Sequence, residues 1–442
     1  MSESEMANDT LSDETIYDNL KSFIESLVTI LDSVPDMNTM ESRFGTHVAT
    51  KQEEEIGSRR AAQIADELQN NWENFPQFEE CEGAFKSSDI FDKEVGYALN
   101  QGVVEDMSEK EELIKTDTLP KFLKRYLTKK GDLEFDADVF DETYEEFEEY
   151  LAADEVEYQA AAVIQRLELQ NSDKVIELED DLRIKCDDSD KFGTSSLSEF
   201  TDYAEQDSGT VTVVEKVYTV DKFGEDNKEQ AIKSFMDVVL ALRLFGSHGD
   251  IFLKDGYTKP ISPFHVGVNR FNFQSDTVPF LDENYVISDD LEEEFIEFWT
   301  DMNENIEDPP ESYRVAIEKF SNSFNRENLN DRLLDSVIAL EAIYLKSSEN
   351  QEMSYRLSQR GALLLANDKS EALDIQSTLS DSYNKRSRLV HGSAPNLNQK
   401  TVVELLDLTR ESLKVFLQEN RGNKSHKKIL EELDEEAVTP VN

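Results

Sequence analysis

The stretch YNKRSRLVHG, residues 383–392, ends a predicted helix and combines three cations with one of the five histidines of the chain. The helix is expected to run from Ala372 to His391. Gly392 is the expected C′ residue and Pro395 stands just beyond it, a pairing that commonly terminates helices. The whole chain carries a formal net charge of −51. A cationic helix end in such an acidic chain therefore calls for a physical explanation.

The sequence on both sides of this stretch predicts a helical bundle. From Asp289 onward, apolar residues recur at helical spacing and the connections between segments are short, which is typical of up-and-down bundles. We assign residues 289–430 to this C-terminal bundle and residues 431–442 to an acidic tail. The expected helices are Leu291–Met302, Tyr313–Phe324, Asn328–Lys346, Met353–Ala366, Ala372–His391 and Thr401–Gln418.

Residues 155–288 have a different pattern, which predicts a mixed α/β region. Short β-branched runs such as TVTVVEKVYTV (210–220) indicate strands, and 229–245 indicates an amphipathic helix. Residues 1–154 form a mainly helical, acidic N-terminal region. The predicted fold class is thus α+β and mostly helical, with a mixed α/β N-terminal and middle region followed by an all-α bundle.

The segment Asp132–Asp154 is the most acidic of the N-terminal region, and its spaced aspartates invite comparison with a calcium-binding loop. Ala137 stands where the sharp turn of such a loop needs glycine, and Thr143 where it needs a bidentate glutamate. Apolar residues at helical spacing instead predict a helix whose acidic face is solvated.

Composition excludes several classes of protein. The chain has 45 Lys and Arg against 96 Asp and Glu, with 25 Phe and 14 Tyr, so it can build folded cores. We interpret the acids as adaptation to molar salt, because they alternate with apolar helix positions; an acidic interaction surface is the alternative. Cys81 and Cys186 are the only cysteines, which favours a reducing, cytoplasmic compartment. The acidic residues 1–5 do not resemble a signal peptide, and no apolar run is long enough for a membrane span.

The charge is unevenly distributed. Residues 311–430 hold 18 basic and 16 acidic residues, a net of +2, whereas residues 1–310 hold 27 and 75, a net of −48. An anionic partner would explain why this module is not acidic. Burial in an oligomer interface would explain it equally, and the two explanations are compatible.

The polar residues of this module resemble the C-terminal HEPN domain of the ApeA-like family. The resemblance covers roughly residues 310–420 and rests on Asp331–Asp335 followed by Ala339–Ala342, on Arg356 and Arg360, and on 383–392. A weaker similarity extends upstream, to 175–185 and 239–245. The HEPN signature is an arginine and a histidine a few residues apart, and four residues separate Arg386 from His391.

This resemblance implies a metal-independent endoribonuclease without a cofactor, of the prokaryotic antiviral defence or toxin kind. It also implies a homodimer that brings two Arg–His pairs to one cleft. RNA supplies its own nucleophile, the 2′-hydroxyl, so the protein needs a base and a cation. His391 can act as general acid or base, and Arg386 can bind phosphate oxygens through its planar fork. Lys385, Ser387 and Arg388 are the expected substrate-binding residues.

Helical geometry constrains this prediction. A spacing of five residues puts Arg386 and His391 about 140° apart on a regular helix. They share one cleft only if His391 leaves the helix at its cap or if a dimer supplies the partner. Arg388 would be the nearer neighbour on a straight helix. Active HEPN ribonucleases often carry Asn, Asp or His after the motif arginine, where this chain has Ser387.

Supporting roles fall to Tyr383, Glu341, Arg356 and Arg360. We expect the last two to be structural partners of Glu341 more than RNA contacts. The alternative is that Arg386 and Arg388 themselves pair with Glu341 or other carboxylates and that His391 only ends a helix.

Two other function classes remain open, a non-catalytic RNA-binding or dimerisation module and a scaffold whose neutral face docks another protein. We expect no metal site, because the other four histidines, His47, His248, His265 and His426, lack ligand spacing.

Overall fold

The computed structural model describes most of the chain and divides it into two compact units. The first comprises Met1–Tyr158, Thr219–Asp226 and Lys259–Val268, and the second comprises Gln159–Tyr218, Asn227–Thr258 and Asn269–Asn442. The described residues are 14–33, 57–68, 71–89, 91–92, 94, 110–189, 209–224, 228–246, 251–265, 269–273, 284–306, 309–346, 349, 351–393, 395–421 and 425–438. The predictions for residues 1–5, His47 and His248 lie outside them.

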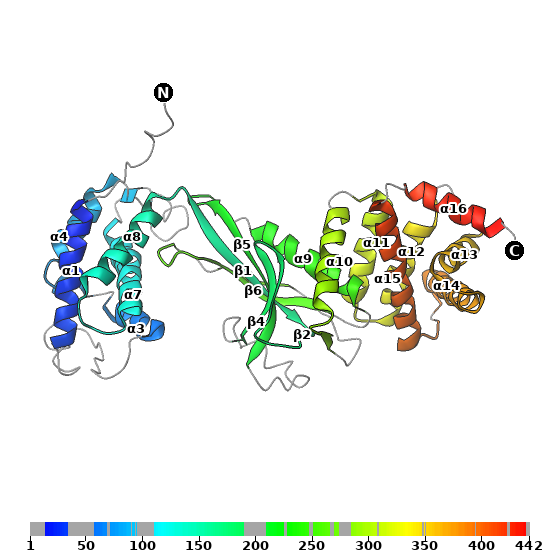
Figure 1. Cartoon of the computed structure of the whole chain (residues 1–442), viewed down its shortest axis with the longest axis horizontal. Helices are drawn as coiled ribbons and strands as arrows, with labels where there is room; N and C mark the ends of the chain where they lie inside the picture. Colours follow the sequence, from blue (N-terminus) through cyan, green and yellow to red (C-terminus); the bar gives the residue numbers. More distant parts are fainter. Residues whose placement is uncertain are drawn as a thin grey trace, which may run out of the picture. The chain divides into compact units, whose positions relative to one another are not determined.

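The chain is α+β and mostly helical, as predicted, with a six-stranded sheet in its middle and a helical C-terminal region (Figure 1). The change of pattern at residue 155 is confirmed, because β1 begins at Glu155. Among the described helices, none is both long and apolar enough to cross a bilayer.

The first unit is helical and has an aromatic core. Phe23, Phe122, Phe140 and Phe147 are fully or almost fully buried. The rings of Phe122 and Phe147 meet edge to face at 5.6 Å between centroids. The helices are α1 (Glu14–Ser33), α3 (Ser58–Leu68), α4 (Phe78–Ser87), α6 (Lys110–Leu113), α7 (Leu119–Lys130) and α8 (Ala137–Ala152), with short turns η1 (Trp72–Asn74) and η2 (Ile114–Thr118).

Helix α8 settles the interpretation of the acidic segment. The Asp136 carboxylate caps it by accepting hydrogen bonds from the backbone amides of Asp138 and Val139. Phe140 and Phe147 are buried, whereas the acids of the same helix, such as Asp141, lie on its outer face. The segment is therefore the predicted helix with a solvated acidic face.

A polar network is enclosed in the first unit beside this core. The Lys222 ammonium is fully buried and lies 2.5 Å from the Glu94 carboxylate; it also donates to the backbone carbonyl of Tyr150 at 2.6 Å. The Tyr150 hydroxyl donates to Glu94 at 2.8 Å and lies 3.1 Å from Nδ1 of His265. Burying a charge this deeply is tolerated only when it is paired and hydrogen-bonded.

The second unit contains the sheet, with strand order β3-β4-β5-β1-β6-β7, and a separate two-stranded parallel pair, β2-β8. Strand β4 pairs antiparallel with both β3 and β5, and its register places Arg183 opposite Glu215. The strands are β1 (Glu155–Gln165), β2 (Leu167–Leu169), β3 (Val175–Glu179), β4 (Leu182–Asp188), β5 (Thr210–Asp221), β6 (Phe252–Pro260), β7 (Asn269–Asn272) and β8 (Tyr285–Ile287).

Helix α9 connects this sheet to the bundle. It packs against α10 and α15 (Figure 1). Its buried Arg243 donates to the carbonyls of Ile251 and Ser321 and to the Asn325 side chain, while the Arg410 guanidinium donates to the Arg243 carbonyl. The helices are α9 (Lys228–Phe245), α10 (Glu292–Ile306), α11 (Glu311–Phe324), α12 (Leu329–Tyr344), α13 (Met353–Leu365), α14 (Lys369–Val390), α15 (Gln399–Arg421) and α16 (His426–Val438).

Helix α16 occupies part of the segment predicted as an acidic tail. Its apolar residues Ile429, Leu430 and Leu433 are buried, so the helix packs against the bundle through these side chains. The prediction failed here because the many carboxylates obscured a short apolar stripe.

The network around His265 predicts a pH-dependent loss of stability. Burial, together with the charges of Lys121 and Lys222, lowers the pKa of His265 from its ordinary 6.5 to about 4. The unfolded chain therefore binds a proton between pH 6.5 and 4 that the folded chain does not. Stability present above pH 6.5 is lost as the pH falls, by up to about 3 kcal/mol.

His265→Asn removes this titration and should flatten the dependence of unfolding free energy on pH between 6.5 and 4. Urea unfolding followed by Trp72 in a Trp299→Phe background reports on the first unit, because Trp72 is buried there and Trp299 belongs to the second. If the unfolding free energy depends equally steeply on pH in the wild type and in His265→Asn, the lowered pKa of His265 is not the cause of the stability loss.

Candidate nucleic-acid interface

Helix α14 carries the predicted site at its C-terminal end. The helix starts at Asp368, whose carboxylate accepts from the amides of Ser370 and Glu371. It ends where Gly392 adopts φ +81. The Gly392 amide then donates to the Leu389 carbonyl at 3.0 Å.

The cap is completed by the Ser393 amide, which donates to the Arg388 carbonyl at 2.8 Å. This pair of bonds is the Schellman arrangement, so the prediction of Gly392 as the C′ residue is confirmed. His391 is the C-cap, with φ −88 and ψ 13, and its backbone has left the α-helical conformation. The His391 amide still donates to the Ser387 carbonyl at 3.1 Å, so the chain leaves the helix only after the Cα of His391, and a cleft shared with Arg386 stays a prediction.

Arg386 points to the neighbouring helix α12. Its Nη2 lies 3.4 Å from Oε2 of Glu341, and the two side chains are 28% and 16% exposed. Within the described part of the chain, Nε of Arg386 and Oε1 of Glu341 are buried without a hydrogen-bond partner. Burial raises the pKa of the Glu341 carboxyl, and the Arg386 charge only partly opposes this. The pair is thus long and incompletely hydrogen-bonded, and Arg386 would have to shift its side chain to offer the buried Nε donor to a ligand.

The rest of the predicted cluster is open to solvent. Arg388 and His391 are exposed, and Lys385 and Ser387 are half-buried. Within the residues that the structure describes, none of these four side chains has a hydrogen bond or ion pair. The alternative of carboxylate pairing holds for Arg386 and fails for Arg388.

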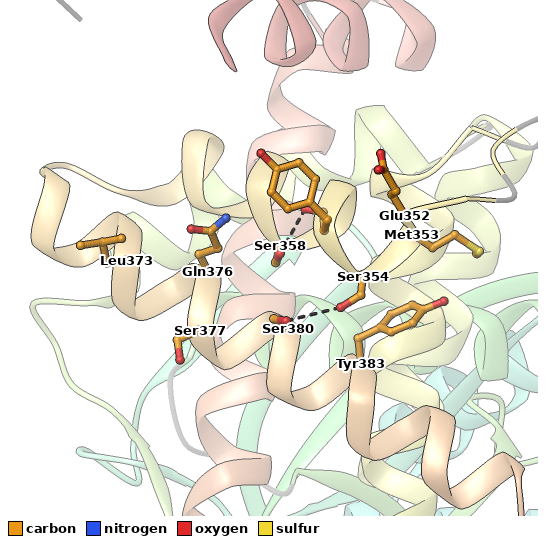
Figure 2. Close-up of a pocket in the computed structure, with 10 residues that line it drawn as sticks. Glu352, Met353, Ser354, Ser358, Leu373, Gln376, Ser377, Ser380 and Tyr383 are labelled. Carbon is orange, nitrogen blue, oxygen red and sulfur yellow. Dashed lines mark hydrogen bonds between the residues drawn. The ribbon is translucent and has the colours of Figure 1, made fainter. Parts of the chain in front are cut away.

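Tyr383 lies on the same helix, one turn before Arg386. The Arg386 guanidinium carbon is 6.0 Å from the centroid of the Tyr383 ring. Burial is the main cause of the raised pKa of the Tyr383 hydroxyl, with a further contribution from Glu341. Tyr383 also lines a groove between α13 and α14 (Figure 2).

Arg356 and Arg360 do not bind Glu341, which corrects our prediction. Arg360 is almost fully buried and donates to Glu349 at 2.8 Å, to Asp434 of α16 at 2.8 Å and to the Tyr344 carbonyl at 2.5 Å. Within the described residues, the carboxylate that Arg356 contacts is Glu349, at 3.5 Å. The partners Glu349 and Asp434 lie outside the motif from which the pairing was predicted. Arg360 is therefore a structural anchor for α16.

The groove itself is a feature that the sequence analysis missed. Its signal was present, because α13, MSYRLSQRGALLL, has no carboxylate. Among the described residues, no group of three or more His, Cys, Asp or Glu side chains is arranged to hold a metal ion.

No model of a known protein family matches the chain, and comparisons with curated proteins and with solved structures find no significant similarity. The site is consequently interpreted from its geometry and from the resemblance of its residues to the HEPN motif.

Replacing Gly392 tests the cap on which the position of His391 depends. A Cβ at Gly392 meets no atom within 4 Å, so the cost of Gly392→Ala is that of the left-handed backbone alone, about 1 kcal/mol. Gly392→Asn should cost less, because asparagine tolerates this conformation. Thermal unfolding measures both, and a stabilising Gly392→Ala would contradict the assigned helix end.

Proposed function

We propose that this protein is a metal-independent endoribonuclease of the HEPN type, with Arg386 and His391 as its catalytic residues. The observation that carries the proposal is the cluster at the end of α14. Arg388 and His391 are exposed without a protein partner in the described residues, and Arg386 keeps an unbonded Nε donor. Elsewhere the acidic chain pairs many of its cations, as in Lys21–Asp141 and Arg125–Glu146.

The chemistry starts at the 2′-hydroxyl of RNA. His391 takes the proton of this hydroxyl, the 2′-oxygen bonds to the adjacent phosphorus, and the bond from phosphorus to the 5′-oxygen of the next nucleotide breaks. The 5′-oxygen takes a proton from solvent, and His391 returns its proton to solvent. The products are a 2′,3′-cyclic phosphate and a 5′-hydroxyl. Because no water or oxidant is consumed, the step needs only an acid–base group and a cation.

Arg386 stabilises the negative charge that builds on the phosphorane oxygens. Glu341 would hold its guanidinium in the resting state. Because burial raises the pKa of Glu341, this carboxyl takes up a proton more readily than an exposed one when a phosphate draws Arg386 away. Lys385, Ser387 and Arg388 would contact neighbouring phosphates.

The biological setting is taken from the resemblance. It implies a cytoplasmic defence or toxin effector that works as a homodimer through the C-terminal bundle. The acidic composition further indicates that the protein works in a cell adapted to high salt. The near-neutral charge of residues 311–430 supports both an RNA partner and a self-contact of this module.

The second candidate is a non-catalytic RNA-binding or dimerisation module. The Arg386–Glu341 contact favours it, because an ion pair between α12 and α14 also serves a purely structural bundle.

Mapping of RNA ends tests the proposal. Arg386→Ala and His391→Ala should each lower the cleavage rate by about 100-fold or more, because each removes a group that acts in the transition state. Lys400→Ala is the matched control; it removes a cation whose side chain is 84% exposed, outside the cluster, and should leave the rate unchanged.

The nuclease assignment is wrong if the wild type makes no cuts or if either variant cuts as fast as the wild type. Wild-type protein that binds RNA without cutting it would favour the second candidate. In both cases RNA affinity should fall as salt rises, since phosphate contacts release counterions.

A further inference from the structure

A shallow groove runs between α13 and α14, next to the cationic helix end. Figure 2 shows Tyr383 and Met353 at one end of it and Leu373 at the other. Tyr355 and Leu373 are unusually exposed for their size, at 54% and 58%. The groove is lined by Glu352, Met353, Ser354, Tyr355, Ser358, Leu373, Gln376, Ser377, Ser380 and Tyr383.

The groove follows from how the two helices pack. At one point they approach closely because Gly361 has no side chain; a Cβ there would lie 2.4 Å from Cδ1 of buried Leu379. Ser354, Ser358, Ser377 and Ser380 line the groove together with larger side chains, and the hydroxyls of Ser354 and Ser380 lie 3.4 Å apart (Figure 2). The small serines leave room between the larger side chains.

The lining suits a flat, polar, aromatic ligand with a negative backbone. It offers two tyrosine rings, serine hydroxyls and the amide of Gln376, and Glu352 is its one carboxylate. In a chain with 96 Asp and Glu, such a surface can accept a polyanion that most of the chain would repel.

The groove leads to the candidate catalytic residues. Its α14 residues, Leu373, Gln376, Ser380 and Tyr383, recur every three or four positions and so share one face of the helix. The same spacing continues through Ser387 to the cap. His391 lies about 12 Å along the helix axis from Tyr383, at about 1.5 Å per residue.

We propose that this groove binds a single-stranded segment of RNA beside the cleavage point. Unpaired bases stack on Tyr355 and Tyr383, serine and glutamine side chains hydrogen-bond base edges, and the backbone runs toward Arg386 and His391. The inference rests on the proposed function for its choice of RNA. A base-paired duplex hides its base faces, so it cannot use these rings, whereas single strands are commonly held by aromatic stacking beside cations.

Binding is measured with full-length His391→Ala, so that affinity is observed without cleavage. The probe is a fluorescent, unstructured uridine-rich oligonucleotide, compared with an RNA duplex of equal length. The single strand should bind at least about 10-fold tighter. Tyr355→Ala should weaken it by about 5- to 100-fold, the range for loss of one stacked base, and Tyr355→Phe by less than about 2-fold.

A charge test complements the stacking test. Ser377→Glu places a carboxylate in the groove and should weaken binding several-fold. Gln399→Glu adds the same charge at an exposed position outside the groove and should weaken it less.

The proposal is overturned if the duplex binds as tightly as the single strand, or if Tyr355→Ala and Ser377→Glu bind like the parent. It is also overturned if these changes turn a dimer into a monomer without altering RNA affinity, since the groove would then hold a second copy.

Failure of this inference and failure of the nuclease assignment are distinguishable. Cleavage by the wild type with an unchanged KM in Tyr355→Ala would reject the groove and keep the nuclease. If the wild type binds RNA through the groove but never cuts it, the groove is kept and the nuclease assignment is rejected.

Discussion

The left-handed backbone of Gly392 is the constraint on which the candidate site depends. The Gly392 amide donates to the Leu389 carbonyl and the Ser393 amide donates to the Arg388 carbonyl, and these two hydrogen bonds end α14 at His391. On an unbroken helix the arginine and histidine would diverge by about 140°. The proposed chemistry needs both side chains to reach one phosphate, and the structure fixes where they start: Arg386 contacts Glu341 of α12, and His391 is the last residue before the turn at Gly392.

Electrostatics distinguishes this helix end from the rest of the molecule. In the first unit, cations such as Lys21 and Arg125 are bound by carboxylates, and Lys222 is buried with Glu94. At the end of α14, Arg386 pairs with Glu341, whereas Lys385 and Arg388 have no carboxylate partner within the described residues. Helix α13 beside them has no carboxylate. This combination favours a negatively charged partner at one place in a chain that is otherwise strongly acidic.

Local chemistry was predictable from the sequence, and long-range pairing was not. The end of α14, a helix within residues 132–154 and the change to strands near residue 155 depend on neighbouring residues, and the structure has all three. The partners of Arg360 were not predicted. Asp434 is 74 residues away, and it belongs to a helix whose many carboxylates led us to predict an acidic tail. The lack of carboxylates in α13 was visible in the sequence, but the groove itself depends on the packing of Gly361 against Leu379 of α14, a contact between two helices that the sequence does not reveal.

The chemical identity of the RNA ends tests the central claim most directly. If Arg386 and His391 direct attack by the RNA's own 2′-hydroxyl, each cut must leave a 2′,3′-cyclic phosphate and a 5′-hydroxyl. One 2′-deoxy substitution at the cleaved nucleotide must then abolish that cut, with neighbouring cuts unaffected. Mass spectrometry of the fragments reads both results. Products with a 5′-phosphate, or undiminished cleavage at the 2′-deoxy position, would show that water is the nucleophile and would contradict the account.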